Sequence, residues 1–183
     1  MHKKKVFTVA VLVLAAVTLV VIPSSAQDSL KLSGVWNYYT YAVKGDEVIQ
    51  DWDNPSTAEL TYLDGQAIEL VVTEHTAVGP RTTPFLGKLT PGGQLKLFFP
   101  DPAMVLPDGT ELSIIDIVEG HTGCTVLGGT FPTFHGWMDG ERLYASAHFN
   151  SRCDQEWPSN DVFDVPIDGP VQWSWTIDLT VDP

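Results

Sequence analysis

The eleven residues from Val171 to Val181 constrain the fold most. Apolar and polar side chains alternate there without a break, with valine, tryptophan, isoleucine or leucine at every odd position. A period of two is typical of a β-strand that has one buried face and one solvated face. On a helix, with about 3.6 residues per turn, the same apolar residues would point all round the axis. This segment therefore predicts a strand, with Trp173 and Trp175 in the core.

Similar segments precede it, and little of the chain looks helical. Strands are expected at residues 30–43, 57–62, 66–74, 85–89, 94–99, 111–119, 130–138 and 142–150. Turn signals rich in Gly, Pro and Asp separate several of them, as at 64–65, 91–93, 107–109 and 139–140. Longer loops are expected at 44–56, 100–110 and 151–170.

Short connections between strands favour antiparallel neighbours and therefore a meander. A long meander is expected to close on itself, because an open sheet would leave two unpaired edges. The sequence thus predicts an all-β, single-domain, antiparallel up-and-down β-barrel of about 8–9 strands. The alternative is a two-sheet β-sandwich or jelly roll.

The N-terminus has the pattern of a secretory signal peptide. Three lysines at residues 3–5 precede 17 residues without a charge, Val6 to Ile22, and Pro23-Ser24-Ser25-Ala26 then offers small residues for cleavage. We expect a signal peptide at 1–26, a barrel domain at 27–183 and a secreted or periplasmic protein. The alternative is an uncleaved anchor, because about 17 apolar residues can just span a bilayer. After cleavage no stable membrane insertion is expected.

The chain is acidic, and this restricts its partners. Loss of the three lysines with residues 1–26 takes the formal net charge from −13 to about −16. Such a charge argues against nucleic acid and anionic membrane surfaces as partners. It is also typical of a solvated acidic surface.

Cys124 and Cys153 are expected to form one disulfide, because an even pair in an oxidising compartment is typically bonded. Asp139-Gly140 is a favoured hairpin-turn dipeptide. Folding the chain there pairs residues whose numbers sum to 279 and brings Cys124 opposite Gln155, two residues from Cys153. A bulge or loop around Gly128-Gly129 would absorb the difference.

The same register sorts the side chains of this hairpin onto two faces. The apolar face comprises Phe134, Met138, Leu143, Ala145, Ala147 and Phe149. The polar and aromatic face comprises Thr133, His135, Trp137, Arg142, Tyr144 and Ser146. The favoured interpretation places the apolar face in the core. In the alternative, His135, Trp137, Tyr144 and Arg142 line a ligand cavity in the barrel lumen.

Metal chemistry has little support in the sequence. In the 279 register His135 and His148 lie about 13 Å apart along the ladder, too far for one zinc ion. Asp51, Asp53 and Asn54 offer oxygen ligands for calcium, as do Asn160, Asp161 and Asp164, but without the order of a calcium loop. No cofactor and no metal are predicted.

Trp52 and Trp157 differ from the other tryptophans because each lies in a loop-like stretch among carboxylates and amides. Exposed aromatic rings in that setting are used by sugar-binding surfaces. The same pattern also suits a loop packed onto the barrel mouth, which is the favoured interpretation.

Leu32-Ser33-Gly34-Val35-Trp36 opens the first mature strand, and this Gly-x-Trp with the following meander resembles the lipocalins and wider calycin barrels. The resemblance implies that Trp36 plugs the closed end and that the other end admits an apolar ligand. The long helix that precedes the last lipocalin strand is not found here.

The sequence therefore favours a barrel that binds a small apolar or amphipathic molecule without chemistry, and the ligand part follows from the resemblance. One alternative is a cofactor-free isomerase or cyclase using His135, Tyr144 and Arg142, which requires His135 to face the lumen. Another is a carbohydrate- or surface-binding sandwich, which requires Trp52 and Trp157 to be exposed side by side.

Overall fold

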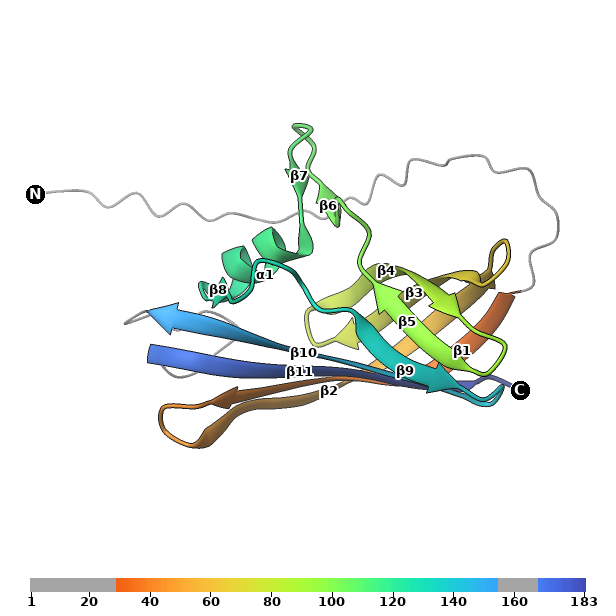
Figure 1. Cartoon of the computed structure of the whole chain (residues 1–183), viewed down its shortest axis with the longest axis horizontal. Coiled ribbons are helices and arrows are strands. Elements are labelled where there is room, and N and C mark those ends of the chain that lie inside the picture. The colour runs from red at the N-terminus through yellow and green to blue at the C-terminus, as the bar shows by residue number, and fades with distance from the viewer. Residues whose placement is uncertain (1–28, 155–167) are drawn as a thin grey trace, which may run out of the picture.

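Eight antiparallel strands close a barrel in the computed structural model, which describes residues 29–154 and 168–183 (Figure 1). The barrel strands are β1 (Ser29–Ala42), β2 (Glu47–Tyr62), β3 (Ala67–Thr76), β4 (Gly79–Leu89), β5 (Gln94–Phe98), β9 (Phe134–Met138), β10 (Arg142–Asp154) and β11 (Asp168–Val181). Each strand pairs with the next along this series, and β11 pairs with both β10 and β1, which closes the ring. The predicted up-and-down barrel is confirmed.

An insertion between β5 and β9 contains the other elements. It comprises a small hairpin of β6 (Met104–Val105) and β7 (Glu111–Leu112), then α1 (Ile114–Thr122), then β8 (Thr125–Val126), which adds to β10 as an extra strand. In the part of the chain that is described, no helix is both long enough and apolar enough to cross a membrane.

The predicted strand at 111–119 is wrong, because most of it forms α1. Ser113 caps the helix: its side chain accepts from the backbone of Asp116, and the Asp116 carboxylate accepts from the Ser113 backbone. Gly123 ends the helix in the left-handed conformation, with φ of 69°. These caps outweigh the β-branched residues in between.

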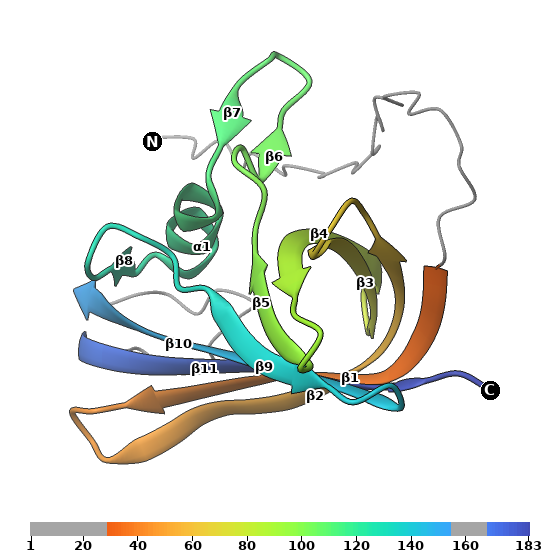
Figure 2. The ribbon, with the colours of Figure 1, turned by 45° about the vertical axis from the view of Figure 1, so that its right-hand side comes forward.

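The predicted loop at 44–56 is also wrong, because β2 begins at Glu47. Residues 47–55 pair with β1 and, among the described strands, with no other, whereas β3 joins β2 only from Ser56 onwards. Together with β1, β10 and β11, this half of β2 forms a sheet that projects beyond the ring, here called the arm (Figures 1 and 2). Likewise β10 continues to Asp154 and β11 starts at Asp168, inside the predicted loop 151–170.

The barrel interior is divided by residue type. Toward the start of β1 it is aliphatic, with Leu32, Leu60, Ile68, Leu70, Leu95, Leu143 and Leu179 at 0–1 % exposure. Toward the arm it is aromatic. Rings there contact one another in a continuous cluster of Trp36, Tyr38, Phe85, Phe99, Phe131, Phe134, Phe149 and Trp175. The predicted burial of Trp173 and Trp175 is confirmed.

Two glycines allow the strands to approach closely where the sheet bends into the ring. A Cβ at Gly34 would lie 2.1 Å from the Asp178 carbonyl oxygen, and one at Gly136 would lie 1.8 Å from that of Tyr144. No side chain fits at either position without moving the backbone. Gly34 of the Gly-x-Trp motif therefore serves strand packing, and Trp36 beside it is fully buried.

The β9–β10 hairpin has a register two residues away from the predicted one. Observed pairs such as Tyr144 with Trp137 sum to 281, because Gly140 and Glu141 form the turn. The Asp139 carboxylate accepts from the backbone N–H groups of Glu141 and Arg142, which fixes this turn. A shift of two residues leaves every side chain on its predicted face.

The predicted disulfide between Cys124 and Cys153 is confirmed, with Cα atoms 4.3 Å apart. Val126 pairs with Ser151 and Thr125 with Arg152, so the β8–β10 pairs sum to 277 and the next pair in that register is the two cysteines. The bond ties the insertion to the arm. It indicates an oxidising compartment.

Candidate functional site

The hairpin's apolar face lies inside the barrel and its polar and aromatic face lies outside. Phe134, Leu143 and Ala145 are fully buried, whereas His135 and Arg142 are exposed and Trp137 is 39 % exposed. The favoured interpretation of the hairpin is confirmed, and the alternative, in which the polar face lines the lumen, is wrong. His135 faces solvent because it is out of phase with the buried residues of β9.

Outside the barrel these residues form a small surface cluster. The rings of Trp137 and Tyr144 stack with centroids 6.1 Å apart, and the Arg142 guanidinium lies 5.8 Å from the Trp137 ring while pairing with Asp178. His135 does not join it, since its neighbour on β10 is Ser146. His148 is two residues further along β10, so the two histidines are diagonal neighbours about 7–8 Å apart rather than about 13 Å.

The three residues of β2 that offer oxygen ligands for calcium do not share one face of the strand. Asp51 and Asp53 point outward, and both accept from the Asn37 amide, at 3.0 and 2.9 Å. Asn54 points inward, because successive side chains of a strand alternate. Among the described residues no group of three or more His, Cys, Asp or Glu is placed to hold a metal ion.

Trp52 lies on the inner face of the arm, opposite Tyr38, and is 45 % exposed. It therefore borders the opening of the barrel. Trp157 lies outside the described residues, so the predicted pairing of the two rings has no structural test.

A buried polar cluster on the inner wall was not predicted from the sequence. Glu74 of β3 has a side chain only 1 % exposed, and its carboxylate accepts from the Asn54 amide at 3.0 Å. Its other oxygen lies 3.3 Å from Arg81 Nε, close enough for an ion pair but without hydrogen-bond geometry. Arg81 also donates to the Tyr38 hydroxyl at 3.3 Å. We call Tyr38, Asn54, Glu74 and Arg81 the mouth cluster.

The mouth cluster spans the opening. Arg81 comes from β4 and Tyr38 from β1, and two strands, β2 and β3, lie between them in the wall. All four side chains lie on the inner face, so the Arg81–Tyr38 contact reaches across the interior. Arg81 remains 56 % exposed and thus forms the solvent side of the cluster. Glu74 could have been noticed because it is in phase with Ile68, Leu70 and Val72 on the core face of its strand.

Burial raises the pKa of Tyr38 well above 10.0; the Arg81 charge opposes this shift, and the charge and hydrogen bonding of Glu74 add to it. Tyr38 is therefore a neutral phenol across the physiological range. It stacks on Trp36 with ring centroids 5.3 Å apart, so the polar cluster is directly joined to the aromatic interior.

Within the described residues, two indole N–H groups in this interior have no acceptor. Trp36 Nε1 and Trp175 Nε1 are both buried without a hydrogen-bond partner. Other buried polar groups nearby are paired: Thr40 donates to Gln50 at 2.7 Å, and Trp173 Nε1 donates to Ser151 at 2.7 Å. Since buried donors are normally satisfied, these two could donate to an acceptor that the described part of the chain does not supply.

No protein-family model matches the chain, and a search of curated proteins finds no similar sequence. What is shown is the closed eight-strand antiparallel barrel, which is consistent with a calycin-like fold.

Proposed function

We propose that this protein is an exported, calycin-like barrel that binds a small amphipathic molecule at its mouth without chemistry. The observation that carries the proposal is the mouth cluster, in which a buried carboxylate adjoins an aromatic wall with two N–H donors that have no acceptor among the residues at 29–154 and 168–183. Ligand sites combine apolar walls with a few convergent polar groups in this way.

Each part of such a ligand has a matching group. Trp52, exposed on the inner face of the arm, offers a flat apolar surface next to the opening. Arg81 is the solvent-facing donor that a polar headgroup meets first. Carbonyl, ether or hydroxyl oxygens of the ligand would accept hydrogen bonds from the indole N–H groups of Trp36 and Trp175.

Export is part of this proposal. Residues 1–26 have the order of a signal peptide, and the disulfide fits an oxidising extracellular or periplasmic space. The enzyme alternative is not proposed, because it requires His135 to face the lumen and His135 is exposed on the outer face.

Native mass spectrometry of the exported protein, followed by fluorescence titration with a panel of fatty acids, sterols and aromatic amphiphiles, tests the proposal. We expect a co-purified small molecule, or quenching of tryptophan emission that saturates. Glu74→Gln and Arg81→Gln should weaken binding about tenfold or more, because hydrogen bonds to charged groups contribute about 1.5–3 kcal/mol.

Glu69→Gln and Lys88→Gln are matched controls, since they lie on the same two strands but on the outer face. They should leave affinity unchanged. The proposal is contradicted if the protein carries no co-purified molecule and no amphiphile quenches its tryptophan emission. It is also contradicted if the control variants weaken binding as much as Glu74→Gln and Arg81→Gln do.

A further inference from the structure

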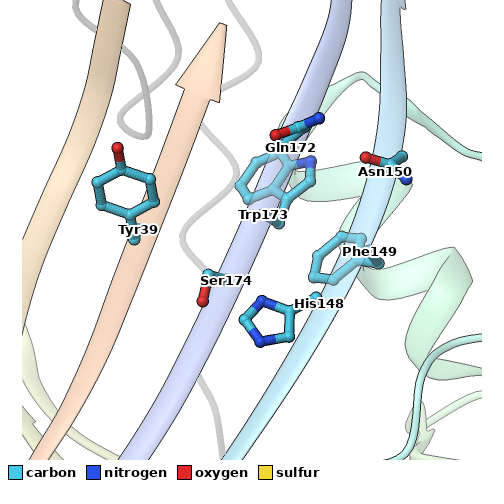
Figure 3. Close-up of a pocket in the computed structure, with 7 residues that line it drawn as sticks. All are labelled: Tyr39, His148, Phe149, Asn150, Gln172, Trp173 and Ser174. Atoms are coloured by element: carbon cyan, nitrogen blue, oxygen red, sulfur yellow. The ribbon is translucent and has the colours of Figure 1, made fainter. Parts of the chain in front are cut away.

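The outer face of the arm carries a pocket of about 300 Å³ (Figure 3). The outward side chains that line it come from three neighbouring strands: Tyr39 of β1, Gln172 and Ser174 of β11, and His148 and Asn150 of β10. The mouth cluster uses the opposite face of the same sheet, since Tyr38 and Tyr39 point to opposite sides. The two sites are therefore independent.

The strand register explains why the surface is hollow here. Ser174 pairs with Tyr39 on one side and with His148 on the other, so a small residue lies between two ring side chains. In the next row Gln172 pairs with Asn150 and closes one end of the hollow with two amides. Figure 3 shows Ser174 between the Tyr39 and His148 rings, whose broad faces are turned toward the viewer.

The outward lining groups are polar and include both hydrogen-bond donors and acceptors. Two amides, one hydroxyl, one phenol and one imidazole face the pocket, and no Asp, Glu, Lys or Arg is among the lining residues. Asp51, which pairs with Tyr39 on the side away from Ser174, is the nearest carboxylate in this row of cross-strand neighbours. It accepts a hydrogen bond from the Asn37 amide and does not line the pocket. The formal net charge of −13 further disfavours an anionic ligand.

We propose that this pocket binds one ring of a neutral saccharide. A sugar ring carries hydroxyl groups that donate and accept, which match the Gln172 and Asn150 amides, and an apolar C–H face, which can lie on the Tyr39 ring. The volume of about 300 Å³ lies at the small end of ligand pockets and suits a single ring of a longer chain.

NMR titration of the exported, disulfide-bonded protein tests this inference. The probes are glucose, galactose, N-acetylglucosamine and cellobiose, with glucuronate as the anionic counterpart. We expect saturable shifts in the side-chain amide signals of Gln172 and Asn150 and in the backbone signal of Ser174. Glucuronate should bind less than the neutral sugars.

Tyr39→Ala should weaken this binding about tenfold through loss of the stacking surface, whereas Tyr39→Phe should retain most of it. Ser174→Phe should abolish it by filling the hollow. Tyr144→Ala is the matched control, because Tyr144 lies on the same outer face, on β10, pairs with Asp178 rather than with a lining residue, and does not line the pocket. Thermal unfolding of each variant verifies that the barrel is intact.

The inference is overturned by the absence of saturable shifts with every neutral probe. It is also overturned if the shifts persist in Ser174→Phe, if they map to Trp52 at the mouth, or if glucuronate binds as tightly as the neutral sugars. Because amphiphile binding is measured at the opposite face, failure here leaves the mouth proposal standing, and the reverse also holds.

Discussion

At the scale of single residues, Tyr38 connects the aromatic interior to the polar opening. The folded protein keeps its hydroxyl protonated, because burial raises its pKa well above 10.0, whereas the unfolded chain ionises near the ordinary value. The contribution of Tyr38 to stability is thus fully present below pH 10 and declines as the pH rises past it.

Replacing Tyr38 by Phe should remove this part of the alkaline decline. Urea unfolding at pH about 8 and about 11 measures it, and the loss of free energy of unfolding between the two should be smaller in Tyr38→Phe than in the wild type. Equal losses of unfolding free energy in the two proteins would show that the pKa of Tyr38 is the same in the folded and the unfolded state.

The residues of the mouth cluster were hard to predict, because they come together only through the closed ring. Glu74 and Arg81 are cross-strand neighbours, but Tyr38 joins them from the far side of the interior. The alternative that placed the hairpin's polar face in the lumen was wrong because the pattern does not define which face is inside. His135, Tyr144 and Arg142 were correctly placed on one face, and the sequence pattern alone left open whether that face points inward.

At the scale of elements, backbone proximity decides which glycines can be replaced. Gly136→Ala should destabilise the barrel by about 1–3 kcal/mol, since its Cβ would meet the Tyr144 carbonyl and the backbone must shift. Gly120→Ala should instead stabilise it by about 0.5–1 kcal/mol, because Gly120 lies in α1 with nothing within 4 Å of its added Cβ. Chemical denaturation of both variants measures the contrast, and two changes of the same sign would contradict it.

Element types were predictable where the pattern repeats and not where it is interrupted. The eleven alternating residues of β11 predicted a long strand, and the structure extends it to Asp168–Val181. In α1 the run of isoleucine and valine favoured a strand. The signal that indicates a helix is the spacing of Ser113 and Asp116, which suits a capping box. In β2, acidic residues, an asparagine and a proline suggested a loop. They occupy a strand that pairs along one edge only with the strands described here, and such residues are tolerated at an edge.

At the scale of the whole molecule, the disulfide holds the insertion on the arm. Replacing both Cys124 and Cys153 by Ser should lower the free energy of unfolding by about 3.5 kcal/mol, the loop-closure value for their separation of 29 residues. Urea unfolding of the oxidised wild type and the double variant measures this. The reduced wild type is the control and should match the variant.

The topology of the barrel was predictable because each barrel strand pairs with the next barrel strand along the chain. Short turns imposed this order, and the long insertion between β5 and β9 did not break it, because its two ends return to adjacent strands. The disulfide partners were likewise identified although the hairpin register was wrong by two residues. Residues 127–133 absorb the change from pairs that sum to 281 to pairs that sum to 277.

The two ends of the described barrel meet on adjacent strands. Leu32 pairs with Val181, and the Asp182 backbone donates to Lys31 at 2.9 Å. Val78, by contrast, is 99 % exposed in the turn between β3 and β4. A circular permutant that joins the two ends beside Asp182 and begins after Val78 would therefore keep every strand pair of the barrel. Its new termini would lie close to Arg81 of the mouth cluster. A fluorescent label attached there would report ligand binding at that cluster.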